Sequence, residues 1–143
     1  GLPFVDTEEG RVVAAGGVYE IDPAASAPGS AGSGLKRFPG EGVRFEHVPG
    51  GSLPARDGVE ERGYEWRLTD RTDGSVQYFD ADGNPVAFAD RHGNRTDFAF
   101  TAASEDTWQL TAVTDPYGAT TEVAYSDGRV VFTAPARSGD GHR

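Results

Sequence analysis

Residues 83–100 read GNPVAFADRHGNRTDFAF and contain the strand and turn pattern that recurs along the chain. Apolar side chains alternate with their neighbours at Val86/Phe88 and again at Phe98/Phe100. Alternation with a period of two places one set of side chains on a core face and the other toward solvent, as in a β-strand. Between the two runs stands RHGN, a turn signal in which glycine tolerates positive φ. The stretch therefore predicts two short antiparallel strands joined by a tight turn.

The same pattern continues on both sides of this stretch. Alternating apolar runs occur at Tyr64/Trp66/Leu68, Val76/Tyr78, Trp108/Leu110 and Val123/Tyr125, and residues 129–133 (RVVFT) form one more strand candidate. Turn signals separate the runs at residues 73–74, 81–84, 116–118 and 127–128. No long window keeps apolar residues at the spacing of a helix face, so we expect strands throughout.

The spacing of the turns is regular. Glycines stand at positions 74, 83, 93, 118 and 128, with gaps of 9, 10, 25 and 10 residues, and the long gap equals two steps plus a polar loop over Ala102–Thr107. An aspartate three residues before the glycine can accept a hydrogen bond from the backbone two residues on and start the turn. The turn-forming pairs are Asp80/Gly83, Asp90/Gly93 and Asp115/Gly118. We therefore predict an all-β fold, an antiparallel meander of short hairpins with a period near 10 residues, stacked into an extended or curved sheet.

Residues 1–63 are less regular and predict an irregular β region. We expect strands over Leu2–Val5, Arg11–Ile21 and Gly42–Val48, followed by a turn-rich connection over Pro49–Arg56. Residues 22–34 consist almost entirely of Ala, Ser, Gly and Pro and predict a flexible loop, because they bury little apolar surface. The regular sheet is expected over residues 64–134, and residues 135–143 are expected to be a disordered tail.

Composition excludes several classes of function. The 143 residues carry 13 basic and 23 acidic side chains, a formal charge of −10, without a basic cluster. Such a chain is a poor partner for nucleic acid and for anionic membrane surfaces, since both attract cationic proteins. No apolar run is long enough to span a bilayer, so we expect no membrane insertion. The chain has no cysteine, which excludes disulfides and thiolate chemistry.

We expect no enzyme activity and no bound metal or cofactor. The carboxylates are scattered over turns, and no serine lies in a Gly-x-Ser-x-Gly elbow. Asp80, Asp82 and Asn84 alternate faintly like a calcium loop, but a bidentate glutamate at the required spacing is missing. His92 stands in a turn beside Asp90, where a solvated histidine is the ordinary outcome. The turn interpretation is therefore favoured for all of these residues.

The aromatic residues leave two interpretations open. Most of them lie in the apolar phase of the alternation, which favours cross-strand core pairs. The alternative is an exposed surface that stacks on carbohydrate or contacts a protein partner. Phe79 and Tyr117 fall outside the apolar phase and are the better candidates for exposed contacts. The candidate binding residues are Trp66, Phe79 and Tyr117.

Residues 83–100, together with LTAVTDPYGATTEVAY at 110–125, resemble the Rhs/YD-repeat family. The family pattern is a G-x-x-x-x-x-x-D-x-x-G-N unit, a strand that ends in an aromatic residue, and an I/V-T-D-P-x-G unit. Residues 64–80 resemble the segment that introduces the repeats. The resemblance covers residues 64–134 well and residues 1–63 weakly.

The resemblance implies a large secreted or cell-surface protein whose strands wind into a hollow β-shell. In bacterial members the shell encloses a C-terminal toxin, so the chain would be a non-catalytic slice of the wall from the N-terminal part of the repeat region. The self-cleaving element of the family has two D-P-x-G motifs, whereas only Asp115–Gly118 is present here, so protease activity is not expected. The expected partners are the rest of the shell or the enclosed toxin. The alternative function is a carbohydrate- or protein-binding β-module at the cell surface.

A slice of such a wall would have unpaired strand edges, which recruit other strands. We therefore expect either a homodimer formed by edge pairing or an edge that is capped by residues 1–48.

Overall fold

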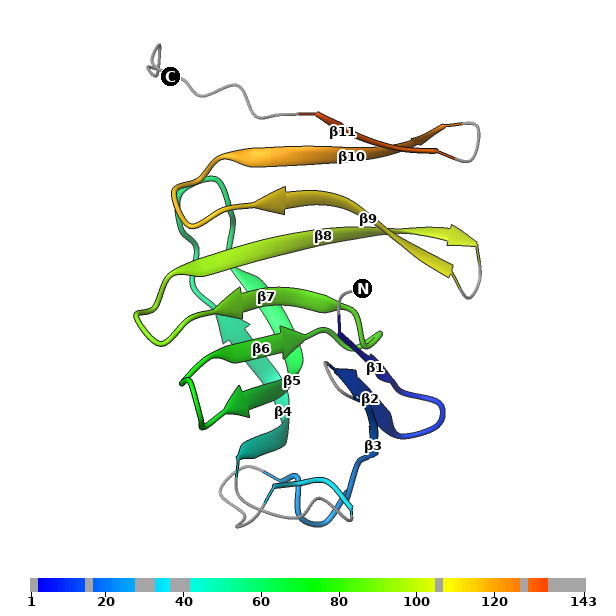
Figure 1. The fold of residues 1–143 in the computed structure, drawn as a ribbon, viewed down its shortest axis with the longest axis vertical. Coiled ribbons are helices and arrows are strands. Elements are labelled where there is room, and N and C mark those ends of the chain that lie inside the picture. Colours follow the sequence, from blue (N-terminus) through cyan, green and yellow to red (C-terminus); the bar gives the residue numbers. More distant parts are fainter. Residues whose placement is uncertain are drawn as a thin grey trace.

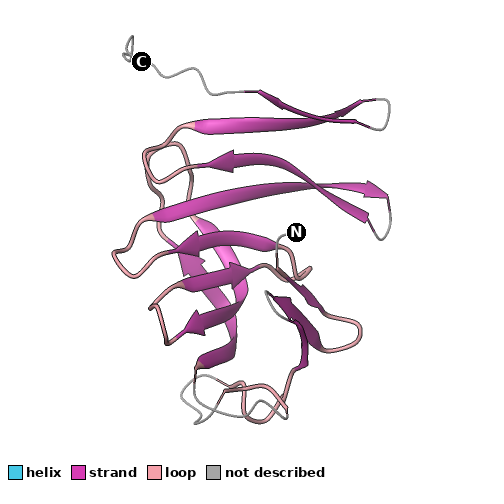
Figure 2. Ribbon diagram, viewed as in Figure 1, coloured by secondary structure: helices cyan, strands magenta, loops and turns pink. Residues whose placement is uncertain are grey.

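The chain is all-β. The computed structural model describes residues 3–14, 17–27, 33–36, 42–104, 107–126 and 129–133, and every regular element in these residues is a strand (Figure 2). The strands form two antiparallel sheets, one of three strands and one of eight (Figure 1). The predicted fold class is confirmed.

The larger sheet is a meander with the order β11-β10-β9-β8-β7-β6-β5-β4, so each strand pairs with the next along the chain. Because all connections join direct neighbours, short turns are sufficient, as the glycine spacing predicted. The strands are β4 (Val43–Leu53), β5 (Arg62–Asp70), β6 (Val76–Phe79), β7 (Pro85–Ala89), β8 (Arg95–Ser104), β9 (Thr107–Thr114), β10 (Thr120–Ser126) and β11 (Arg129–Thr133).

The smaller sheet consists of β1 (Phe4–Asp6), β2 (Arg11–Ala14) and β3 (Gly17–Glu20), in that order. The prediction of a single strand over Arg11–Ile21 was wrong, because the chain reverses in the middle of this segment. Arg11 pairs with Glu20, and Val13 pairs with Val18. The alternation of apolar residues is the same on both arms of a hairpin, so it did not reveal the reversal, although Gly16 and Gly17 offered a place for it.

Two connections are shorter than predicted. The expected connection over Pro49–Arg56 is partly strand, because β4 continues to Leu53 after a register shift between His47 and Gly51. A β-bulge accommodates a proline and glycine that a regular strand would not tolerate. The expected polar loop over Ala102–Thr107 is also mostly strand, since Ser104 pairs with Thr107. Residues 105–106 of that loop lie outside the described residues.

The core lies on both faces of the central strands. Between the two sheets, Phe45 and Phe79 of the larger sheet pack with Val5 and Val12 of the smaller one, and all four are at most 2% exposed. On the other face, Leu53, Val86 and Ala87 form a second cluster with the rings of Tyr64 and Tyr78. Burying a valine or phenylalanine side chain stabilises a fold by roughly 1.5–3 kcal/mol, so the smaller sheet is held mainly by the first cluster.

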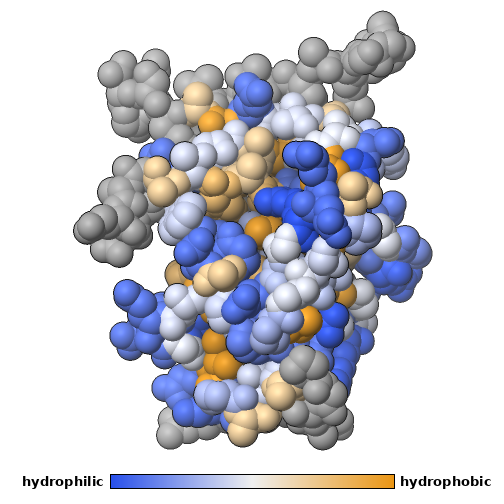
Figure 3. Space-filling model, turned by 180° about the vertical axis from the view of Figure 1, so that it is seen from behind, coloured by the Kyte–Doolittle hydropathy of each residue, from blue (hydrophilic) through white to orange (hydrophobic). Residues whose placement is uncertain are grey.

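The predicted disordered tail, residues 135–143, lies outside the described residues, as do residues 28–32 of the predicted loop over 22–34. Seen from behind, hydrophilic side chains cover most of the described surface, with small groups of hydrophobic ones between them (Figure 3). Among the described residues, no helix is present that is long and apolar enough to cross a membrane.

Candidate functional site

The structure separates the three aromatic residues that the sequence singled out for binding. Tyr117 is 84% exposed on the turn between β9 and β10. Trp66 is partly buried, and its ring stacks on the imidazole of His47 with centroids 5.1 Å apart. Trp66 also pairs across β5 and β6 with Phe79. The three residues therefore do not form one surface.

The prediction that Phe79 is exposed was wrong, since its side chain is 0% exposed. The prediction from the alternation requires one side of β6 to face solvent, but both faces of this strand are packed against other parts of the chain. Tyr78 points into the cluster around Val86, and Phe79 points into the core between the two sheets. The smaller sheet buries the face of β6 that carries Phe79, and the position of this sheet was not predicted from the sequence.

The opposite error occurred at Trp108, which the alternation assigned to the core. Its side chain is 39% exposed, near the end of the long β8–β9 hairpin. Period-two alternation specifies a face of the strand, but it does not tell whether the hairpin still overlies the core at that point. The side chain of Tyr125, also expected in the core, lies outside the described residues.

The predicted turn residues form three copies of one turn. In the first, the backbone N–H of Gly83 donates to the carbonyl of Asp80 (2.9 Å), and that of Asp80 donates to the carbonyl of Asn84 (2.9 Å). The Asp80 carboxylate accepts from the N–H groups of residues 82 and 84, both at 2.9 Å. The other two copies have the same four hydrogen bonds, all between 2.8 and 3.0 Å, with Asp90/Gly93 and Asp115/Gly118 in place of Asp80/Gly83.

The turns differ in their surroundings, and the pKa values of their aspartates show it. Burial raises the pKa of the Asp80 carboxyl, against the opposing effect of its hydrogen bonds to the backbone. The pKa of Asp90 is instead lowered, first by the hydrogen bond from the side chain of Asn94 (3.0 Å) and then by that from its backbone N–H. The turn at Asp80 is thus packed against other parts of the molecule, whereas the one at Asp90 faces water.

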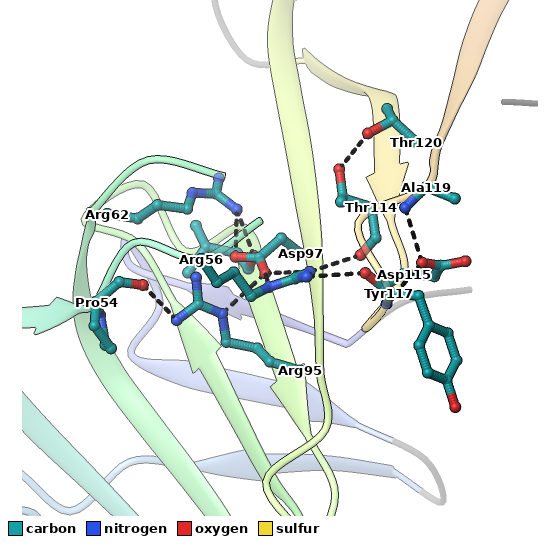
Figure 4. A network of polar contacts seen from close by, with 11 residues as sticks. Pro54, Arg56, Arg62, Arg95, Asp97, Thr114, Asp115, Tyr117, Ala119 and Thr120 are labelled. Carbon is teal, nitrogen blue, oxygen red and sulfur yellow. Dashed lines mark hydrogen bonds and ion pairs between the residues drawn. The ribbon is translucent and has the colours of Figure 1, made fainter. Parts of the chain in front are cut away.

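Among the described residues, the most concentrated group of charges lies around Asp97 on β8 (Figure 4). Its side chain is only 3% exposed and contacts three arginines: Arg56 (2.8 Å), Arg95 (2.9 Å) and Arg62 (3.3 Å). We call these four residues the Asp97 cluster. A buried carboxylate is tolerated when paired charges and hydrogen bonds replace its hydration, as they do here.

The Asp97 cluster joins distant segments of the chain through backbone carbonyls. Arg56 donates to the carbonyls of Thr114 (3.0 Å) and Asp115 (2.9 Å), next to the β9–β10 turn. Arg62 donates to the carbonyl of Val86 on β7 (2.7 Å), and Arg95 donates to that of Pro54 (2.8 Å). The connection between β4 and β5, residues 54–61, is thereby fixed across the face of β7, β8 and β9.

The Asp97 cluster holds segments of the chain together. The three guanidinium groups can only donate hydrogen bonds, and both oxygens of the Asp97 carboxylate are engaged by them. A cavity of about 380 Å³ lies beside it between residues 58–62 and strands β8 and β9. Within the described ranges, no group of three His, Cys, Asp or Glu residues could hold a metal ion.

Sequence reasoning missed this cluster. The only local signal is the pair Arg95 and Asp97, two residues apart and therefore on the same face of one strand. That spacing suggests an ion pair along the strand, but nothing in the sequence connects it to Arg56, 41 residues away.

The outer edge of β4 is capped by an earlier part of the chain. The outward N–H groups of Phe45 and His47 donate to the carbonyls of Ser33 (2.6 Å) and Ser26 (2.8 Å). Arg44, only 5% exposed, fixes the same segment by donating to the carbonyls of Ala25 (2.7 Å) and Ala27 (2.8 Å). We call residues 25–27 and 33–35 the β4 cap.

The two edges of the larger sheet are therefore different. At the opposite edge, β11 pairs with β10 only, and none of the described segments pairs with its outer side. One edge is capped at Phe45 and His47, and the other has no partner among the described segments, which corresponds in part to the expectation that residues 1–48 cap an edge.

No protein-family model matches the chain, and comparisons with curated proteins and with solved structures find no similar protein.

Proposed function

We propose that the chain is a non-catalytic wall segment of an Rhs/YD-repeat β-shell, from the N-terminal part of the repeat region. In this proposal it belongs to a secreted or cell-surface bacterial protein that encloses or presents a toxin. The observation that supports it most directly is the difference between the two edges: β4 is capped at Phe45 and His47, whereas none of the described segments pairs with the outer side of β11. Such a sheet can add strands more readily at β11 than at β4.

Two further features support a wall. The turns repeat with one hydrogen-bonding pattern, so the same unit can be added many times without a new kind of connection. The Asp97 cluster fixes the first strands against β8 and β9, which gives a growing sheet a rigid beginning. Scaffolding requires these properties, and it requires no reactive group.

The proposal is tested first on the reading frame that encodes the chain. We expect further Asp-x-x-Gly units at steps of about ten residues after position 143, followed by a C-terminal domain of unrelated sequence. A reading frame that ends without further units, or that continues into an unrelated fold, would overturn the proposal.

The second test measures the edges directly by hydrogen exchange and by light scattering after size exclusion. We expect slow exchange at the amides of Phe45 and His47, fast exchange at every second amide of β11, and self-association that increases with concentration. Proline replaces an edge residue without disturbing the sheet when the lost N–H points outward. Adjacent N–H groups of a strand point to opposite sides, so one of the two substitutions Val130→Pro and Val131→Pro removes an outward N–H and the other an inward N–H. The first should abolish association without destabilising the fold, and the second should also destabilise the fold. Association that survives both substitutions, or a monomer at all concentrations, would contradict an open edge.

A further inference from the structure

A second cavity lies where the smaller sheet meets the β6–β7 turn. Its volume is about 320 Å³, and its walls come from β1, the β1–β2 turn, the turn at residues 80–84 and Trp108 on β9. None of the aromatic residues predicted to bind lies in it. Its principal side chains are Phe4, Asp6, Glu8, Asp82, Asn84 and Trp108.

The backbone around the cavity is fixed on both sides. The N–H of Val5 donates to the carbonyl of Gly83 (2.7 Å), which joins β1 to the β6–β7 turn. The Asp6 carboxylate accepts from the N–H groups of Glu8 (3.2 Å) and Glu9 (3.1 Å). The Asp80 carboxylate positions residues 82 and 84 in the same way. The cavity is therefore largely formed before any ligand arrives.

Two aromatic side chains in the cavity are exposed to solvent. Phe4 is 43% exposed and Trp108 is 39% exposed, although they belong to different sheets and are about 100 residues apart in the sequence. The face of an aromatic ring has a negative electrostatic potential and attracts cations, and the ring of tryptophan attracts them most strongly.

The polar groups of the cavity are acidic, and two are without a partner. Among the described residues, the carboxylates of Glu8 and Asp82 accept no hydrogen bond and form no ion pair, whereas Asp6 is paired with Arg11 at 3.2 Å. Asn84 is only 8% exposed, and its Nδ2 atom has no hydrogen-bond partner there either. The cavity thus offers two uncompensated negative charges, and the Asn84 side chain in its wall has a buried amide nitrogen without a partner.

We infer that this cavity binds an arginine or lysine side chain of a basic peptide segment. The cation would lie against Phe4 and Trp108 and face the carboxylates of Glu8 and Asp82. A carbonyl oxygen of the peptide backbone would accept from the amide of Asn84 once that side chain turns toward it. The net charge of −10 attracts a basic partner over longer distances. This inference does not depend on whether the sheet belongs to a repeat shell.

The inference is tested by NMR titration of the whole chain with acetyl-Gly-Arg-Gly-amide, its lysine analogue and its glutamine analogue. The chain has two tryptophans, so the indole N–H of Trp66 serves as an internal reference for that of Trp108. We expect the arginine and lysine peptides to shift the signals of Trp108, Asp82 and Asn84, with an affinity that falls as salt increases. The glutamine peptide should leave them unchanged.

Matched variants identify the site. Glu8→Gln and Asp82→Asn should each weaken binding roughly twofold to fivefold, in the range of exposed charge pairs. Glu9→Gln removes the same charge one residue away, outside the cavity, and should have a smaller effect. Trp108→Ala should weaken binding by at least roughly twofold. Tyr117→Ala removes another exposed aromatic ring and should leave the affinity unchanged.

The other outcomes contradict the inference. Equal effects of Glu8→Gln and Glu9→Gln would mean attraction by net charge without a site. Equal binding of the glutamine peptide, or binding of a neutral sugar such as glucose in place of the cationic peptides, would exclude a cation site. The absence of any shift with the arginine and lysine peptides would do the same.

Discussion

Replacing Gly83 by alanine should detach the smaller sheet, whereas the same replacement at Gly93 should not. The two glycines occupy the same position in two copies of one turn, with φ of 88° and 85°. Alanine at such an angle costs roughly 1–2 kcal/mol in either place. At Gly93 an added Cβ would meet nothing within 4 Å, whereas at Gly83 it would overlap the carbonyl oxygen of Val5. The comparison therefore isolates the contact between β1 and the turn.

The additional loss at Gly83 follows from what β1 contributes. Its hydrogen bond from Val5 to Gly83 contributes about 1 kcal/mol. Val5 and Val12 are 2% and 0% exposed, and each would lose roughly 1.5–3 kcal/mol of burial if the smaller sheet were released. Complete release thus costs about 4–7 kcal/mol, and a partial shift costs less. We expect Gly83→Ala to be at least about 3 kcal/mol less stable than Gly93→Ala, a difference in Tm of roughly 6–12 °C.

Thermal and urea denaturation followed by circular dichroism measure this difference, and NMR spectra report whether β1–β3 have left the sheet. If Gly83→Ala does not fold, Val5→Ala keeps the turn and its backbone contact intact and weakens the attachment of the smaller sheet by removing side-chain burial in the core. Equal stabilities of Gly83→Ala and Gly93→Ala would refute the reasoning, since they would mean that the close contact with Val5 contributes nothing.

Four other substitutions test the remaining contacts. Asp97→Ala leaves three arginines facing one another without their carboxylate and should cost about 3–5 kcal/mol in urea denaturation, whereas removal of the exposed carboxylate of Glu60 should cost little. The pKa of Asp90 is lower in the folded chain than its ordinary value of 3.8. Its contribution to stability is therefore present above pH 3.8 and is lost as the pH falls through the folded pKa. Asp90→Asn should lower Tm at pH 7 and should lower it much less in acid. The pKa of Asp80 is raised, so its contribution is present below 3.8 and is lost as the pH rises through the folded pKa; Asp80→Asn should leave Tm at pH 7 unchanged or higher, and a clear decrease would contradict this. Arg44→Ala removes two hydrogen bonds to the β4 cap and should speed hydrogen exchange at Phe45, while unchanged exchange there would mean that the cap holds without it.

The sequence predicted the repeated part of the fold because that part is determined locally. An aspartate that hydrogen-bonds the backbone of its own turn, a glycine that accepts positive φ and an alternating strand lie within about ten residues of one another. Each unit can therefore be recognised without knowledge of the rest of the chain. The meander order then follows, because short turns can join only neighbouring strands.

The long-range contacts could not be predicted in this way. The burial of Phe79 depends on a hairpin about 70 residues earlier in the sequence, and the pairing of Arg56 with Asp97 spans 41 residues. Neither contact produces a periodic pattern in the sequence, since each contact can be formed by a single partner residue. The β4 cap was not predicted for a different reason. Its composition of small residues indicated a loop, but small residues also allow a segment to approach a strand edge closely. An added Cβ at Gly34 would overlap the carbonyl oxygen of Phe45.

The three identical turns show how a repeating sheet can acquire specific contacts without changing its backbone. The turn at Asp80 receives the N–H of Val5, the turn at Asp90 faces water, and the turn at Asp115 receives the guanidinium of Arg56. In both contacts the internal hydrogen bonds of the turn remain the same. Val5 uses the carbonyl of Gly83, which accepts none of the turn's four hydrogen bonds, whereas Arg56 uses the carbonyl of Asp115, which also accepts from the N–H of Gly118 (3.0 Å). Further strands joined by the same turn would present the same two carbonyls. A turn of this kind therefore binds another segment through its backbone carbonyls without a change of turn type, and residues 1–63 supply the donors, Val5 and Arg56, for two of the three turns.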